Sequence, residues 1–247
     1  MESFEVPDIT PPTSRLSLDK SCAISKRDIN PYVKKARSIN EGNFIDLDFS
    51  ASSKHLSFFL SQYRYFLLDP MAGSGTFCVN LARDYPMLGI VAVEKRFKRA
   101  VSLYQKCQKH GLKNIFVIRG TFEKSVLLLR GVKFDVVYLA FPDPWDRKKW
   151  EKHRVYKDLT LFYPLLKQKG FLILKTDNFE VISSVFRHYF ECFSLIRLHF
   201  PYIEPIKKFR TDFEKLFLSK KGNIWCMCLQ PNLVCLNSVT SERAELG

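Results

Sequence analysis

The sequence predicts a doubly wound α/β fold in which a mainly parallel sheet carries helices on both faces. Short apolar runs alternate with segments of helical spacing through the middle of the chain. Two of the apolar runs end in an acidic residue, and turn-forming glycines and prolines separate the segments. Such alternation is typical of parallel sheets covered by helices. Because these sheets bind ligands at the carboxyl ends of their strands, near the point where strand order reverses, the residues directly after each strand are the most informative.

Seven strands and four helices are expected from these patterns. The strands cover residues 65–69, 88–94, 114–120, 134–140 and 171–177, with two more near 192–200 and 223–230. The helices cover residues 76–85, 96–110, 155–168 and 179–190. Helical spacing is clearest in the second helix, because its apolar residues recur on one face and its basic residues take the other.

One folded domain is expected over residues 41–230, because 247 residues with 46% hydrophobic side chains can bury a full core. Residues 1–40 hold several prolines and basic side chains, which predicts a basic, flexible N-terminal arm. Residues 231–247 predict a polar C-terminal tail. No apolar run is long enough to span a membrane, and the N-terminus lacks the pattern of a secretory signal. A soluble, cytoplasmic protein with no membrane partner is therefore expected.

The charge balance indicates a polyanionic partner. The chain has 39 Lys and Arg against 25 Asp and Glu, which gives a net charge of +14. A strong positive balance on a soluble domain is typical of proteins that bind nucleic acid. A basic surface that serves only solubility is the alternative, and charge alone does not decide between them.

The seven cysteines predict reduced structural thiols and no metal site. Their number is odd, and most of them stand in apolar stretches, as small core residues do. Cys226 and Cys228 lie two apart in a strand-like run. A zinc site would need a second pair of ligands, and the sequence shows none.

The loop after the first strand reads DPMAGSGT over residues 69–76. Gly73 and Gly75 allow the backbone to approach a ligand closely, although an ordinary strand-to-helix turn would also use them. Glu94 ends the next strand, about 20 residues further on, where an acid can accept both hydroxyls of a ribose. The phosphate-binding pattern GxGxxG is absent. The pair of features therefore favours a nucleoside-containing ligand over a simple turn.

The loop after the fourth strand reads FPDPW over residues 141–145. Its two prolines stiffen the chain and hold Asp143 at the mouth of the expected site, and a rigid structural turn is the alternative. Five of the next nine residues, 146–154, are Lys or Arg, with Trp and His between them. This mixture suits a phosphate backbone with exposed bases, whereas a solvated start of a basic helix would look similar.

Two further motifs follow later strands. Residues 175–178 read KTDN, and residues 211–214 read TDFE, with Phe217 and Gly222 before the last strand. Each of these motifs alone fits a helix cap equally well. Thr211 with Glu214, for example, forms the pattern of a capping box.

The chain closely resembles the tRNA (guanine-N7-)-methyltransferase family over roughly residues 65–229, because it carries FPDPW, KTDN and TxFExxF…G in this order. DPMAGSGT resembles the S-adenosylmethionine loop of nucleic-acid methyltransferases. The resemblance implies a seven-stranded, Rossmann-like methyltransferase sheet within residues 41–230, S-adenosylmethionine as cofactor and tRNA as partner. It leaves the oligomeric state open between monomer and homodimer.

The resemblance also implies roles for individual residues. The implied cofactor-binding residues are Asp69, Gly73, Gly75, Glu94, Thr121 and Asp143. The implied substrate-binding residues are Arg147, Asp177, Thr211, Asp212, Phe213 and Glu214, and Asp143 is also the implied catalytic residue. The chain departs from the family pattern at three of these positions. Asp69 replaces a Glu, Thr121 replaces an Asp or Asn that contacts the adenine amine, and Arg147 replaces a Lys.

The implied reaction is methyl transfer to N7 of a guanine in tRNA, which gives 7-methylguanosine. Guanine N7 has a free lone pair at neutral pH, so catalysis would consist mainly of alignment, with a carboxylate such as Asp143 stabilising the charge that develops. Two alternatives remain. DPMAGSGT is common in enzymes that methylate an exocyclic amine of RNA or DNA, and Thr121 with Met71 would fit a non-catalytic RNA-binding subunit.

Overall fold

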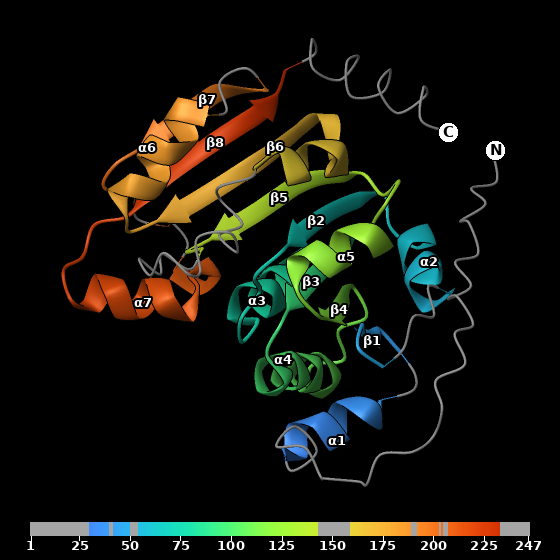
Figure 1. The fold of residues 1–247 in the computed structure, drawn as a ribbon. Coiled ribbons are helices and arrows are strands. Elements are labelled where there is room, and N and C mark those ends of the chain that lie inside the picture. Colours follow the sequence, from blue (N-terminus) through green and yellow to red (C-terminus); the bar gives the residue numbers. More distant parts are fainter. Residues whose placement is uncertain are drawn as a thin grey trace, which may run out of the picture.

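The computed structural model describes residues 30–39, 42–49, 54–142, 159–188, 192–202, 204 and 207–232. Within these ranges one sheet runs through the molecule, with helices on both of its faces (Figure 1). The strands are β1 (Phe44–Asp46), β2 (Tyr65–Asp69), β3 (Leu88–Glu94), β4 (Ile115–Arg119), β5 (Phe134–Ala140), β6 (Leu166–Thr176), β7 (Phe193–His199) and β8 (Trp225–Pro231). The α-helices are α1 (Pro31–Arg37), α2 (Lys54–Ser61), α3 (Thr76–Asp84), α4 (Phe97–Lys109), α5 (Phe122–Leu128), α6 (Phe179–His188) and α7 (Asp212–Ser219). The described ranges also contain two 3₁₀-helices, η3 (Leu159–Leu165) and η4 (Lys207–Phe209).

The strand order confirms the doubly wound fold. The sheet runs β1-β4-β3-β2-β5-β6-β8-β7, and only β8 is antiparallel to its neighbours. The order reverses at β2, which pairs with β3 on one side and with β5 on the other. This reversal point is where a doubly wound sheet forms its ligand crevice, and β2 leads there directly into the loop before α3.

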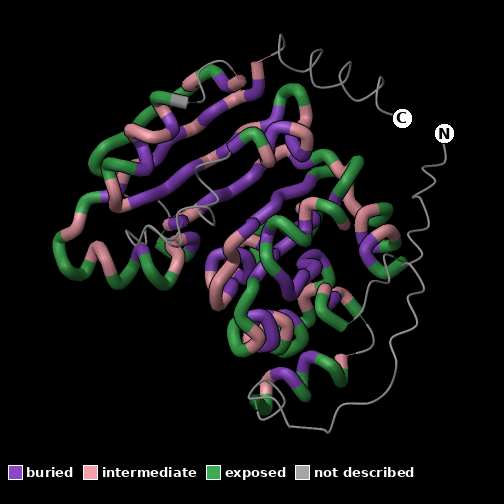
Figure 2. Tube along the Cα trace, in the orientation of Figure 1, coloured by how far each residue is buried: buried purple, intermediate pink, exposed green. Residues whose placement is uncertain are grey.

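Each face of the sheet has its own apolar core. One core joins the sheet to α2, α5, η3 and α6, and the other joins it to α1, α3, α4 and η4. Aromatic stacking occurs in both, between Phe122 and Phe162 on the first face and between Phe77 and Tyr138 on the second. The central strands are buried on both sides (Figure 2), which explains why they read as continuous apolar runs rather than alternating ones.

The expected elements differ from the structure in several respects. The described α-helices α2, α5 and α7 were not among the four that the sequence patterns predict. The sheet has an eighth strand, β1, which has only three residues and pairs with β4 at the edge, so its sequence is too short to show a strand pattern. The helix expected over 155–168 is wrong in its described part, because residues 159–165 form η3 and β6 begins at Leu166. Pro164 lacks the amide hydrogen that an α-helix would need there.

The folded part of the chain begins before residue 41. Residues 31–37, inside the expected N-terminal arm, form α1, whose first amide groups are capped by Asn30: the N–H of Tyr32 donates to Asn30 Oδ1 at 2.9 Å. Val33 and Ala36 are buried where α1 packs on α4. Residues 1–29 and 40 of the expected arm, and the tail beyond Asn232, lie outside the described residues. Across the described ranges, no helix has both the length and the apolar character to cross a membrane.

Candidate functional site

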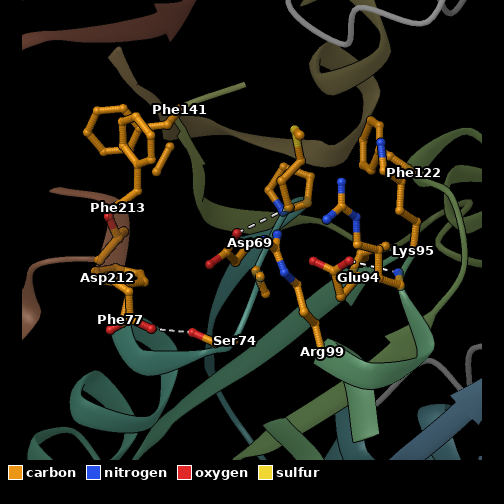
Figure 3. Close-up of a pocket in the computed structure, with 18 of the residues that line it drawn as sticks. Asp69, Ser74, Phe77, Glu94, Lys95, Arg99, Phe122, Phe141, Asp212 and Phe213 are labelled. Atoms are coloured by element: carbon orange, nitrogen blue, oxygen red, sulfur yellow. Dashed lines mark hydrogen bonds between the residues drawn. The ribbon is translucent and has the colours of Figure 1, made fainter. Parts of the chain in front are cut away.

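A pocket of about 670 Å³ opens at the carboxyl ends of β2, β3, β4 and β5, at the point where strand order reverses. Its walls come from the loop after β2, the ends of β3 and β5, the start of α5 and the start of α7 (Figure 3). The residues expected to bind cofactor or substrate that line it are Asp69, Gly73, Glu94, Thr121, Asp177, Thr211, Asp212 and Phe213. Two sets of residues assigned separately from the sequence thus meet in one pocket.

Asp69 stands at the base of the pocket, at the end of β2, and is only 4% exposed. Its Oδ1 accepts the N–H of Met71 at 3.2 Å, and its Oδ2 accepts the thiol of Cys78 at 3.2 Å. Burial raises the pKa of Asp69 to about 7, although these two hydrogen bonds oppose the shift. The carboxyl group therefore changes its charge close to neutral pH.

The two glycines of the first loop have different tasks. Both have positive φ, +58° at Gly73 and +73° at Gly75. A Cβ at Gly75 would lie 2.1 Å from Leu103 Cδ1, so this glycine allows the loop to pack on α4 and does not line the pocket. A Cβ at Gly73 would meet nothing within 4 Å, and Gly73 lines the pocket. Only Gly73 therefore leaves open space toward a ligand.

Glu94 ends β3 and is 6% exposed. Its Oε1 accepts the N–H of Arg96 at 2.7 Å. Burial raises the pKa of Glu94, while the Arg96 amide and the guanidinium of Arg99 act in the opposite direction. Figure 3 shows Arg99 rising from α4 toward the space between Asp69 and Glu94. A carboxylate held in this way has an acceptor oxygen available for the hydroxyls of a ribose.

Thr121 lines the pocket at the end of β4 and is also the N-cap of α5. Its hydroxyl oxygen accepts the N–H of Lys124 at 3.4 Å. The side chain thus has a local structural role, and a second lone pair of its hydroxyl oxygen can accept a hydrogen bond from another donor.

The opposite wall is tied to the first loop by Asp212, the first residue of α7. Its Oδ2 accepts hydrogen bonds from the hydroxyls of Ser74 and of Thr76, the latter at 2.8 Å. Lys106 Nζ donates to the carbonyl of Ser74 at 2.9 Å. Burial acts to raise the pKa of Asp212, but the two hydroxyls and Lys106 outweigh it, so the pKa lies below its ordinary value. Asp212 is therefore an ionised link between α7 and the loop after β2.

Two phenylalanines form the mouth of the pocket. The rings of Phe141 and Phe213 lie 4.7 Å apart, and Phe213 is 44% exposed. Phe141 has φ +50°, which is unusual for a residue with a side chain, and its N–H donates to the carbonyl of Lys175 at 2.7 Å. Phe141 opens the FPDPW loop, but Asp143 and Arg147, the next predicted site residues along it, lie outside the described residues.

Glu214 was expected to bind substrate, but it lies beneath the pocket and does not line it. Its side chain is fully buried, with Oε2 at 3.5 Å from Lys175 Nζ. Lys175 is itself buried and pairs with Glu204 at 2.6 Å. Thr211 caps α7, because its hydroxyl accepts the N–H of Glu214 at 3.0 Å, but the reciprocal bond of a capping box is absent, since neither carboxyl oxygen of Glu214 has a hydrogen-bond partner among the described residues. Glu214 is therefore placed to support Lys175 of the KTDN motif.

Several pocket residues were not predicted. Ser74, Thr76 and Phe141 belong to motifs that the sequence did single out, but nothing in those motifs showed which side chains would meet. Lys106 sits on the wet face of an amphipathic helix, and only its distance to the first loop reveals a role. Among the described residues, no cluster of His, Cys, Asp and Glu is arranged to hold a metal ion.

Curated relatives include many tRNA-modifying methyltransferases. A tRNA (guanine-N(7)-)-methyltransferase from Exiguobacterium sibiricum is 32% identical over 168 residues, covering 63% of this chain and 76% of that protein. The enzyme of the same name from Staphylococcus epidermidis is 28% identical over 196 residues, covering 76% and 89%. A bifunctional glycosyltransferase/methyltransferase from Fusobacterium nucleatum is 32% identical over 157 residues, and the match spans only 24% of its length.

Solved structures show the same fold at low identity. A 30S ribosomal A1408 methyltransferase from an uncultured bacterium superposes with a TM-score of 0.57 at 18% identity, covering 74% of this chain and 95% of that one. TrmN from Thermus thermophilus gives a TM-score of 0.51 at 17% identity, covering 80% and 52%. These likenesses establish the class I methyltransferase fold.

The pocket suits S-adenosylmethionine, the methyl donor of this class. Its volume lies in the range of small-ligand sites. Glu94 offers a carboxylate for a ribose, and Gly73 leaves the backbone open to close approach. The Methyltransf_4 methyltransferase model matches residues 64–227, from the start of β2 into β8, and so includes every strand and loop that builds the pocket. The chain is a member of this S-adenosylmethionine-dependent family, to which its resemblance to the tRNA (guanine-N7-)-methyltransferases pointed.

Proposed function

We propose that the protein methylates N7 of a guanine in tRNA and so forms 7-methylguanosine. The observation that carries this proposal is the meeting of two residue sets in one pocket. Asp69, Gly73 and Glu94 form one wall, and Asp177 with the start of α7 forms the other. A methyl donor and its acceptor must lie side by side, and this pocket offers a separate wall for each. The names of the relatives support the choice of tRNA guanine as acceptor.

The cofactor wall would work by fixed acceptors. Glu94 would accept the ribose hydroxyls, Thr121 would lie at the adenine end, and Gly73 would let the loop lie against the methionine end. When bound, S-adenosylmethionine supplies the methyl group. Gly75, in contrast, acts only through the turn, because its space is filled by Leu103.

The substrate wall would act mainly by alignment. Guanine N7 has a free lone pair, so the chain needs no strong base to expose it. Asp177, which lines the pocket, would accept hydrogen bonds from the N1–H and amino group of a guanine, and the exposed face of Phe213 would offer a stacking surface. Asp143, two residues beyond Phe141, would stabilise the positive charge that methylation leaves on the base.

The test is to incubate the full-length protein with unmodified tRNA and S-adenosylmethionine and to identify the modified nucleoside by mass spectrometry. The proposal predicts 7-methylguanosine, and it predicts that Asp177→Asn lowers turnover while cofactor affinity stays near that of the wild type. A product methylated on an exocyclic amine would support the alternative that DPMAGSGT raises. Binding of tRNA without any product would indicate a non-catalytic subunit. A cytoplasmic location, where tRNA is accessible, belongs to the same proposal.

A further inference from the structure

Two packed helices carry much of the positive charge of the chain. Residues 30–39, which include α1, hold three Lys or Arg, residues 95–114, which include α4, hold seven, and neither segment contains an Asp or Glu. The exposed side chains of these two segments form a surface that we call the α1–α4 basic surface, with Lys34, Lys35, Lys98, Arg99 and Lys109 as its main exposed members. Figure 1 shows α1 lying beside α4, away from α7.

The basic residues of α4 share one side of the helix. At about 100° per residue, Lys98, Arg99, Lys106 and Lys109 fall within an arc of about 100°. The buried residues Ala100, Leu103 and Cys107 lie on the other side. Lys98 and Lys109 are eleven positions apart, which places them about 16 Å apart along the helix axis and nearly in line. The charges therefore form a stripe along one side of α4, with one pair near each end and about 10 Å of helix between Arg99 and Lys106.

The stripe runs into the pocket. Arg99 lines the pocket, and Lys106 donates to the carbonyl of Ser74 in its first loop. Lys98 and Lys109 extend the stripe outward, and Lys98 Nζ lies 5.9 Å from the ring centre of Tyr32 in α1. A polyanion held along α4 would thus lead directly to the site of reaction.

Lysines at several other described positions pair with carboxylates. Lys167 pairs with Asp135, Lys124 with Asp48 and Lys208 with Asp84. Within the described part of the chain, neither Lys98 nor Lys109 forms an ion pair with an acidic side chain. A merely solvated surface has no need to exclude acidic residues over two helices, whereas a surface for phosphates does, since each carboxylate would repel them.

We propose that the α1–α4 basic surface binds the phosphate backbone of the RNA substrate, on the side of the pocket opposite α7. This inference rests on the proposed function, because it takes RNA as the ligand. Contacts of this kind are independent of sequence and would position the RNA rather than select the base.

The test compares two triple variants of the full-length protein. Lys35→Ala/Lys98→Ala/Lys109→Ala removes three charges from the surface. Lys54→Ala/Lys133→Ala/Lys169→Ala removes three exposed charges from α2 and from the amino ends of β5 and β6. The affinity for unmodified tRNA is measured over a series of salt concentrations, with S-adenosylmethionine affinity by calorimetry and thermal unfolding as checks that both variants are folded.

Each phosphate contact adds about 0.9 to the slope of log affinity against log salt on duplex RNA regions, by analogy with B-DNA, and about 0.7 on single strands. We expect the surface variant to flatten the slope by about 2 units and the control variant to leave it near the wild-type value, with cofactor affinity equal in all three. If the surface variant and the control variant had the same salt slope, the proposal would be overturned, because tRNA affinity would then depend on the net charge of the protein and not on this surface.

Two more outcomes are decisive. If the surface variant keeps the wild-type tRNA slope but loses binding to vesicles of anionic phospholipid, the surface serves a membrane and the proposal is wrong. Because tRNA binding is measured without methyl transfer, the two proposals can fail separately. If the wild-type protein forms no 7-methylguanosine while the surface variant still shows the expected loss of slope, the result supports the surface and contradicts the proposed reaction.

Discussion

Asp69 is a carboxyl group that holds its proton up to neutral pH, because burial at the end of β2 raises its pKa from 3.8 to about 7. The unfolded chain would release that proton near the ordinary pKa. Between these two values the native state binds more protons than the unfolded state. The free energy of unfolding should therefore fall as the pH rises from about 4 through about 7, by at most about 1.4 kcal/mol per pH unit from this group.

Asp69→Asn keeps the shape of the side chain and removes this titration. We expect the variant to show a flatter dependence of the free energy of unfolding on pH between about 5 and 7 and to be the more stable of the two above about pH 7. Urea unfolding over that range measures both effects. Glu94, whose pKa burial also raises, remains in the variant, but its charge interacts with that of Asp69, so the difference between the two proteins reports Asp69 together with this interaction. Parallel curves would show that Asp69 is ionised throughout.

Thr121 both caps α5 and lines the pocket, so a substitution that preserves the cap can test its role toward the ligand separately. Aspartate is as good an N-cap as threonine, so Thr121→Asp should preserve α5. A charged acceptor makes a stronger hydrogen bond to the adenine amine than a hydroxyl, and we expect S-adenosylmethionine to bind several-fold more tightly. Thr121→Ala is the matched control, with a loss of about 1 kcal/mol in stability from the missing cap. Calorimetry showing unchanged or weaker cofactor binding by Thr121→Asp would remove Thr121 from the adenine site.

At the scale of elements, the loop between β2 and α3 contains two glycines with different roles. Gly75 allows the loop to pack on α4, and Gly73 lines the pocket. Gly75→Ala combines positive φ with a Cβ that would overlap Leu103, so we expect it to cost more than about 2 kcal/mol of stability. Gly73→Ala meets no neighbour and should cost only about 1 kcal/mol, yet it should weaken cofactor binding. Chemical unfolding and calorimetry on both variants check this. Equal losses of stability in the two variants would mean that the two glycines do not have separate roles in packing and ligand binding.

The sequence predicts best those elements whose burial imposes a simple pattern. β2 to β5 are buried on both faces and therefore appear in the sequence as apolar runs. α4 is buried on one side and exposed to solvent on the other, so its apolar residues recur with the period of a helix. β1 and α1 are short and depend on partners distant in the chain, β4 and α4, which a local pattern does not contain. η3 follows from Pro164 and from the need to enter β6 at Leu166.

The same limit applies to the site. Glu94 and the glycine loop could be placed because a doubly wound sheet brings strand ends together at one edge. The role of Asp212 could not, because it depends on hydroxyls 136 and 138 positions away in the chain. Glu214 was expected at the substrate because it shares a motif with Thr211, but the turn of α7 points it inward to Lys175. Motifs thus locate a segment, and only the fold decides which of its side chains face a ligand.

At the scale of the whole molecule, the pocket joins two parts of the sheet that lie on either side of the reversal point. The loops after β2, β3 and β4 supply one wall, and the end of β5 with α7, which precedes β8, supplies the other. Asp212 is a direct link between them through Ser74 and Thr76. The ring of Phe213 takes no part in this link, so a ligand that binds the first wall should stabilise the native state even when Phe213 is altered.

Thermal unfolding with and without S-adenosylhomocysteine, which retains the nucleoside and amino-acid parts of the cofactor, tests this division. At a concentration about 100 times its Kd, a ligand adds about 2.7 kcal/mol, which corresponds to a rise in Tm of about 5–10 °C for a chain of this length. We expect Glu94→Ala to lose most of that rise, because the ribose loses its acceptor, and Phe213→Ala to keep it, because the ring lies at the mouth of the pocket beside Phe141. Each variant is compared with its own ligand-free Tm, so a change in basal stability does not enter. If Phe213→Ala lost the rise as fully as Glu94→Ala, α7 would belong to the cofactor wall, and the base would have to enter the pocket from another side.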